Sequence, residues 1–156
     1  MGARPLVSGI AVIAATLCAL PATATAAMRK ATGKTSQRQP ALAWVRDDGS
    51  VALVKVKYRA RCRAPGYRSS GVMYYRDNTR KPFVRDGARF SDSGKFETKD
   101  RRGKIVFTTS MAGGPSADGG WEGSFRVQTR WFDRRGHQID FCQTGVRKWK
   151  VAAPAP

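Results

Sequence analysis

Apolar and polar residues alternate with a period of two along much of this chain. Between Val54 and Cys62, apolar residues or alanine occupy every second position, and Lys or Arg fills the positions between them. The segment from Phe125 to Trp131 alternates in the same way. This period predicts strands with one side in the core and the other in water. Residues 105–109 are apolar or β-branched throughout, which predicts a more central strand.

Turn signals separate these segments, and no stretch of ten residues has the period of an amphipathic helix. Sequences with Asp and Gly at turn positions occur at 47–50, 86–87, 100–103 and 133–136. Two longer connections with glycine and proline are expected over residues 63–71 and 112–120, and loops of this kind commonly carry binding surfaces. Short strands at a spacing of about ten residues predict an all-β domain, an antiparallel β-sandwich or barrel-like fold, over residues 41–151.

Residues 1–26 have the layout of a secretory signal peptide. Arg4 precedes an uncharged apolar run from Leu6 to Leu20, and small-x-small sites follow at 22–24 and 24–26. The run is shorter than the roughly 20 residues that a membrane-spanning helix needs. We therefore expect cleavage after position 26, secretion to the extracellular space, and no transmembrane segment in the mature chain.

Two further segments flank the predicted domain. Residues 27–40 carry four cations and no apolar period, which predicts a disordered basic lead-in. Residues 152–156 are alanine and proline and are expected to form a short tail.

Charge dominates the composition. The chain has 29 Lys and Arg residues against 11 Asp and Glu residues, for a formal net charge of +18. A charge of this size bears on association and solubility rather than on the fold. Outside a cell, the anionic partners that it suggests are cell-wall polymers, nucleic acid and acidic glycans. Alternatively, the protein is basic without binding a particular anionic partner.

The most concentrated charge lies on the first strongly alternating strand. Its cations, at alternate positions about 6.6 Å apart, are Lys55, Lys57, Arg59, Arg61 and Arg63. Such a ridge is suited to following a polyanion, with binding that weakens steeply in salt. Alternatively, the charges only solvate the strand and keep it from pairing with neighbours. Tyr67, beside Pro65-Gly66, is the aromatic residue expected at the surface for stacking on bases or sugars.

Two cysteines remain once Cys18 leaves with the signal peptide. In an oxidising compartment, Cys62 and Cys142 most simply form one disulfide. Closing a span of 80 residues (142 − 62) in this way stabilises the fold by about 4 kcal/mol in the chain-entropy model. The chain has one histidine and no Cys/His ligand spacing, so we expect neither a metal site nor a cofactor.

Catalytic signatures are sparse. Glu122, His137 and either Arg126 or Arg130 are the residue types that a small nuclease uses as base, acid and phosphate-binding cation. Nothing in their spacing requires them to meet, so no catalytic residue is assigned, and a small secreted hydrolase stays an alternative. A protein inhibitor or partner-binding domain that uses residues 112–120 is a third possibility. The sequence does not specify an oligomeric state.

A pattern around the cysteines extends over residues 41–151. Its elements are Arg61-Cys62, Gly94-Lys95-Phe96, Ile105-Val106-Phe107, Trp121–Val127, Asp140–Gly145 and Trp149. With its closing Cys-x-Thr-Gly-x-x-x-Trp, this pattern resembles a β-rich domain found in secreted actinobacterial proteins of unassigned function. The resemblance implies secretion, a Cys62–Cys142 bridge and an all-β fold, and it supplies no catalytic residue.

Overall fold

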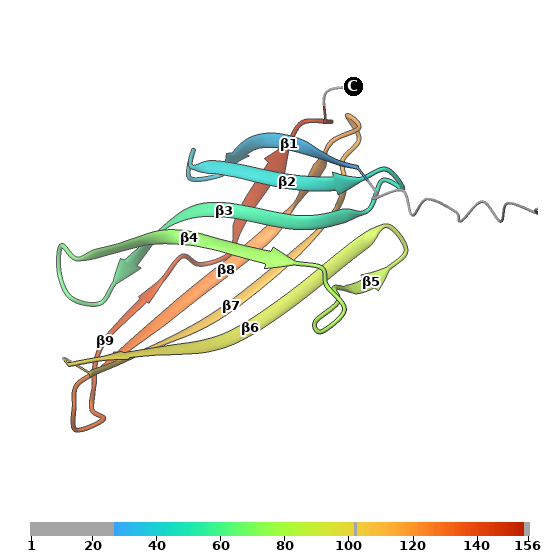
Figure 1. Ribbon diagram of the computed structural model, residues 1–156. Coiled ribbons are helices and arrows are strands. Elements are labelled where there is room, and N and C mark those ends of the chain that lie inside the picture. Colours follow the sequence, from blue (N-terminus) through green and yellow to red (C-terminus); the bar gives the residue numbers. More distant parts are fainter. Residues whose placement is uncertain (1–26, 102, 155–156) are drawn as a thin grey trace, which may run out of the picture.

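The computed structural model describes residues 27–101 and 103–154, which form ten β-strands and contain no helix (Figure 1). The strands are β1 (Met28–Thr35), β2 (Pro40–Arg46), β3 (Val51–Cys62), β4 (Arg68–Arg76), β5 (Val84–Asp86), β6 (Arg89–Asp100), β7 (Gly103–Pro115), β8 (Trp121–Phe132), β9 (Gln138–Gln143) and β10 (Arg147–Val151). Within these two ranges there is accordingly no helix long and apolar enough to cross a membrane. The signal peptide expected over residues 1–26 lies outside the described residues.

All strand pairings are antiparallel, and they arrange the chain in two layers. Strands β1 to β4 form one layer in sequence order, and β8, β7, β6 and β5 form the other, which runs obliquely across it (Figure 1). Two short strands join the layers, because β10 pairs with β1 and β8 while β9 pairs with β8 and β3. Strands β1, β2, β3, β9, β8 and β10 thus close a ring. The expected all-β, barrel-like sandwich is confirmed.

Alternate residues of the long strands fill the space between the layers. Val54, Val56 and Tyr58 of β3 are buried, as are Phe125 and Val127 of β8. Burying a side chain of this size contributes about 1.5–3 kcal/mol relative to exposing it. Both alternating segments recognised in the sequence are confirmed as strands. Residues 105–109 are also confirmed as part of an interior strand, because β7 lies between β6 and β8.

Glycines permit the close crossing of β10 between the layers. A Cβ atom on Gly33 would lie 2.0 Å from the carbonyl oxygen of Lys150, and one on Gly113 would lie 2.5 Å from the Trp149 ring. Only a residue without a side chain leaves room for these approaches. Gly113 lies within strand β7, so the first part of the connection expected over residues 112–120 is a strand.

The segment expected to be a disordered lead-in is largely a strand. Residues 28–34 of β1 pair with β2, from Met28 opposite Arg46 to Lys34 opposite Pro40. The positions of β1 that face inward hold Ala31, Gly33 and Thr35, which are too small or too polar to produce an apolar period. The prediction of disorder is wrong for Met28–Thr35, and the folded region begins before residue 41.

The two long connections are also shorter than expected. Strand β4 already begins at Arg68, and β7 continues to Pro115. A turn over residues 116–120 follows, in which Ser116 N–H donates to the Gly120 carbonyl at 2.9 Å. The predicted turns at 47–50 and 133–136 are confirmed, each with its glycine at positive φ.

Candidate functional site

The outer surface of the β1–β4 layer carries a dense set of cations. We call it the basic face and define it by the exposed cations that point away from the core: Lys30, Lys34, Lys55, Lys57, Arg59, Arg61, Arg68 and Arg76. Four of them come from β3, where strict alternation with buried residues directs every charge outward. The structure thus places Lys55, Lys57, Arg59 and Arg61 on one side of one strand.

Strand pairing sets apolar and aromatic side chains among these cations. Lys55 lies between Leu42 of β2 and Tyr74 of β4. Tyr74 is 66% exposed, whereas most aromatic residues of the chain lie in the core or are half-buried. Arg61 lies directly opposite Arg68, and like charges in that position destabilise a strand pair. On the basic face, the positive charges of Arg61 and Arg68 therefore repel each other, and the ring of Tyr74 is exposed beside Lys55.

Acidic residues are absent from this part of the sequence. Neither residues 28–46 nor residues 51–76 contain Asp or Glu. Within the described ranges, no ion pair involves a cation of the basic face. Within the described part of the chain, no ion pair therefore compensates the charge of this face.

The acidic side chains serve structural contacts at other places. Asp77, just after β4, binds Arg46 at 3.0 Å and Arg85 at 2.6 Å, and its other oxygen accepts the Phe83 N–H at 2.8 Å. Burial raises the pKa of this carboxyl, but the Phe83 N–H and the two guanidinium groups outweigh that effect, so the pKa lies below its ordinary value of 3.8. These contacts tie the end of β4 to β2 and β5.

Replacing Asp77 by Asn is expected to lower the free energy of unfolding by about 2 kcal/mol at pH 7, because two charge-assisted hydrogen bonds are lost. A pKa that is lowered in the folded state stabilises the protein above about pH 4, and this contribution disappears as the pH falls through the folded-state value. Urea unfolding at pH 7 and pH 3 measures both effects, with the exposed turn variant Asp47→Asn as control. A deficit of equal size at both pH values would contradict this account.

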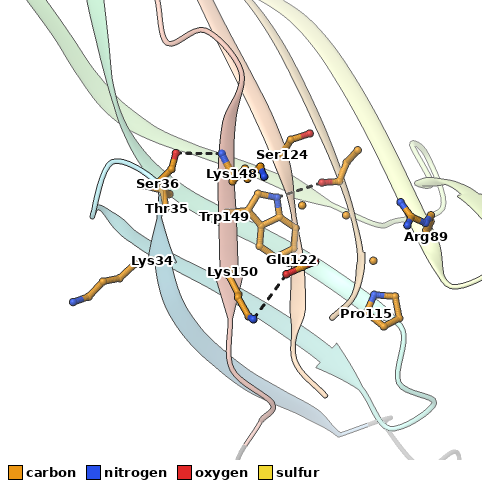
Figure 2. A pocket seen from close by; sticks show the side chains of 14 residues that line it. Lys34, Thr35, Ser36, Arg89, Pro115, Glu122, Ser124, Lys148, Trp149 and Lys150 are labelled. Atoms are coloured by element: carbon orange, nitrogen blue, oxygen red, sulfur yellow. Dashed lines mark hydrogen bonds and ion pairs between the residues drawn. The ribbon is translucent and has the colours of Figure 1, made fainter. Parts of the chain in front are cut away.

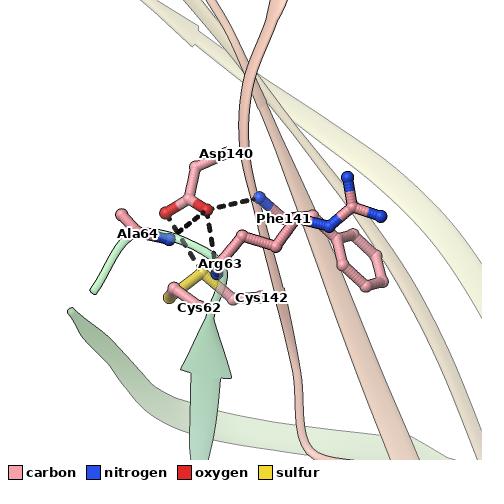
Figure 3. The surroundings of a disulfide bond; sticks show 6 residues. All are labelled: Cys62, Arg63, Ala64, Asp140, Phe141 and Cys142. Carbon is pink, nitrogen blue, oxygen red and sulfur yellow. Dashed lines mark hydrogen bonds between the residues drawn. A yellow bond between two sulfur atoms is a disulfide. The ribbon is translucent and has the colours of Figure 1, made fainter. Parts of the chain in front are cut away.

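The disulfide fastens β3 to β9 at one end of the basic face. Cys62 and Cys142 are paired across these strands, and their sulfur atoms are 2.02 Å apart (Figure 3). Asp140 supports the corner: its Oδ1 accepts the backbone N–H groups of Arg63 at 3.1 Å and of Phe141 at 2.7 Å. The predicted bridge is confirmed. The side chains of Cys62, Cys142 and Asp140 lie close enough to share a metal ion, but both sulfurs are committed to the disulfide.

Arg63, expected in the row of cations, and Tyr67, expected as an aromatic residue at the surface, both lie beyond the end of β3. The guanidinium of Arg63 stacks over the Phe141 ring, 5.4 Å from its centroid, instead of continuing the row of β3 (Figure 3). Tyr67 is 55% exposed, but it closes a turn beyond β3 in which its N–H donates to the Ala64 carbonyl at 3.1 Å. The aromatic residue beside the cations is Tyr74. In the sequence, Tyr74 stands between Met73 and Tyr75, whose side chains are buried on the other side of β4, and this alternation indicates that Tyr74 is exposed. Only the β3–β4 register places it next to Lys55.

A second charged region surrounds Trp149 in a recess of about 530 Å³ (Figure 2). Lys150 lines it and contacts Asp118 at 2.9 Å and Glu122 at 3.9 Å. The Ser116 hydroxyl and Lys150 lower the pKa of Asp118 to about 2. Trp149 itself is 1% exposed and donates its indole N–H to the Ala112 carbonyl at 3.3 Å. Because its charges are partly paired and its ring is satisfied, this recess is a weaker candidate than the basic face.

The residues considered for a nuclease do not come together. Glu122 is the second residue of β8, whereas His137 lies in the turn after that strand ends at Phe132. Ten residues of extended strand separate the two regions by about 33 Å. The His137 ring is largely exposed, with its Nδ1 3.3 Å from Asp133. Glu122 and His137 therefore cannot act on one bond as base and acid.

Comparison with known proteins identifies no relative. No protein-family model, no curated protein and no solved structure matches this chain. What the protein does is therefore inferred from the charges and contacts of its own residues.

Proposed function

We propose that this protein is an extracellular, non-catalytic module that binds anionic polymers through its basic face. One observation carries the proposal. Lys55, Lys57, Arg59 and Arg61 line one side of β3, and no described acidic residue pairs with them. Their regular pitch of about 6.6 Å lets neighbouring cations meet neighbouring charges of an extended polyanion.

The position of β3 favours this function over protection of a strand edge. Charges that guard a strand against unwanted pairing are expected on edge strands. Strand β3 is not an edge, because β2 pairs with one side of it and β4 with the other. Protection of an edge therefore does not account for the charge that it carries.

The contacts around the cations support the same function. An anionic group bound between Arg61 and Arg68 would offset the repulsion between two facing guanidinium groups. Tyr74 offers an exposed ring beside Lys55 on which a base or a sugar can stack. Wall polymers, nucleic acids and acidic glycans all supply anionic groups at repeated intervals, and they are the candidate partners.

Lysine acetylation read by mass spectrometry tests the location of binding. The folded, oxidised protein is treated with and without duplex DNA, purified wall teichoic acid or heparin, and the polymer that protects most strongly identifies the partner class. Lys55 and Lys57 are expected to be protected severalfold, while the exposed Lys95 and Lys99 of β6 react as before. Equal protection of all four lysines by every polymer, or protection of none, would contradict the proposal.

A further inference from the structure

A cavity of about 780 Å³ opens between β4 and β6, on the side where the two layers are not joined by strand pairing. Its volume is in the range of small-molecule sites, about 300–1,000 Å³. Strands β3 and β4 supply one wall, and β6, β7 and β8 supply the other. The apolar and aromatic side chains that line it include Tyr58, Met73, Tyr75, Phe96, Ile105, Phe107, Val127 and Trp131.

Part of this apolar lining is exposed to water. Phe96 is 53% exposed although it stacks on Phe107, with ring centroids 4.6 Å apart and planes 8° apart. Ile105, Phe107 and Trp131 are half-buried, whereas Val127 further along the same interior is fully buried. Contiguous apolar surface of this kind in a concave site commonly marks a place where a ligand binds.

An unsatisfied donor lies at the same place. The Nε1 atom of Trp131 is buried and has no hydrogen-bond partner among the described residues, and the same holds for Oγ1 of Thr129, a fully buried residue. Both side chains project from one side of β8, on which Val127 also lines the cavity. Trp149 shows the usual arrangement, because its indole N–H reaches a carbonyl oxygen. A buried indole N–H without an acceptor is unfavourable, and an acceptor on a ligand would satisfy it once a small side-chain shift exposes the N–H to the cavity.

The charges around the cavity are largely neutralised. Lys81 binds Asp92 at 2.8 Å and the Ser93 carbonyl at 2.5 Å, and it lies over the Tyr75 ring. The Tyr75 hydroxyl donates to Thr109, and burial raises its pKa to about 12, so it stays protonated and uncharged. The interior thus offers apolar surface and the unsatisfied polar groups of Trp131 and Thr129. The lining cation without an ion pair among the described residues is Arg76, an exposed residue at the end of β4 that points away from the core.

We propose that this cavity binds a small, uncharged and mostly apolar molecule that carries one acceptor oxygen. Its rings or chain pack against Phe96 and Phe107, and its oxygen accepts the indole N–H of Trp131. Tyr74 and Arg76 line the cavity and also belong to the outer surface of the β1–β4 layer. The inference rests on the inward-facing Phe96, Phe107 and Trp131, and it therefore does not depend on the proposed polyanion binding.

The neutral fluorophore prodan, a naphthalene that carries a carbonyl acceptor, is the probe. Saturable one-to-one binding with blue-shifted emission is expected. Gly94→Leu is designed to block the site: a Cβ atom there would lie 3.6 Å from Oγ1 of Thr109 and 3.7 Å from Nζ of Lys81, which is ordinary contact, and the rest of the side chain would occupy the cavity. This variant is expected to bind at least tenfold more weakly. Thr108→Leu, exposed on the other side of β7, is the matched control and should bind as wild type.

A second variant tests the hydrogen bond without filling the site. Trp131→Phe keeps an aromatic ring but removes the N–H, so prodan affinity should fall roughly fivefold to tenfold. Emission should shift further to the blue, because the carbonyl loses its donor. Binding that is unsaturable, or equal in wild type and Gly94→Leu, would overturn the proposal. So would a concentration-dependent dimer, detected by sedimentation, that excludes prodan, since a second copy would then occupy the cavity.

Discussion

Replacing both half-cystines, in Cys62→Ser/Cys142→Ser, is expected to lower the free energy of unfolding by about 4 kcal/mol. The disulfide closes a span of 80 residues, and a cross-link of that length removes much of the conformational freedom of the unfolded chain. The bridge also lies where β3 and β9 share only two residue pairs, Arg61 with Gln143 and Cys62 with Cys142. Urea unfolding followed by tryptophan fluorescence measures the loss, and the melting temperature should fall by roughly 15 °C.

Reduction of the wild-type protein provides the control for this prediction. Incubation with a phosphine reductant should bring its unfolding curve onto that of the double variant, which should not itself respond to reductant. A double variant within about 1 kcal/mol of wild type would show that strand pairing alone holds β3 and β9 together, contrary to the role assigned to the bridge.

Neutralising the cations of β3 is expected to have the largest effect on binding. The variant Lys55→Gln/Lys57→Gln/Arg59→Gln/Arg61→Gln should bind the polymer identified by acetylation roughly 100-fold more weakly at about 50 mM salt, because up to four counterion-releasing contacts are lost. Its stability should stay within about 1 kcal/mol of wild type, since all four side chains are exposed. Fluorescence anisotropy with a labelled polymer measures the affinity.

A matched variant separates the site from net charge. Lys95→Gln/Lys99→Gln/Arg126→Gln/Arg130→Gln removes the same four charges from exposed positions on β6 and β8, in the other layer. Its affinity should fall by less than roughly threefold, because attraction from distant charges is screened. An equal loss in both variants would mean that the polymer responds only to total charge.

The long strands β3 and β8 can be predicted because apolar and polar residues alternate clearly along them. Strand β1 cannot, because its alternation is weak. In β3 and β8 the inward positions hold large apolar residues, so the period of two is evident. In β1 they hold Ala31, Gly33 and Thr35, which become core residues only because β2 and β10 pair with this strand. Pairing of this kind depends on tertiary structure and is not encoded in a local pattern.

The same distinction applies to the functional surfaces. The row of cations on β3 follows directly from the sequence, whereas the positions of Arg68 and Tyr74 beside it follow from the β3–β4 register. The alternation also places Arg63 in the row, but β3 ends at Cys62, one residue before it. The cavity was not foreseen, because Phe96 and Phe107 resemble ordinary core positions until the separation of β4 from β6 is known.

The dependence of polymer binding on salt in the wild-type protein and in the two fourfold variants tests the central claim most directly. If the cations of β3 contact the polymer, the plot of log affinity against log salt should be steeper by about 3 to 4 units in wild type than in the β3 variant, and unchanged in the β6–β8 variant. The same slope in all three proteins would contradict the basic face as the binding site.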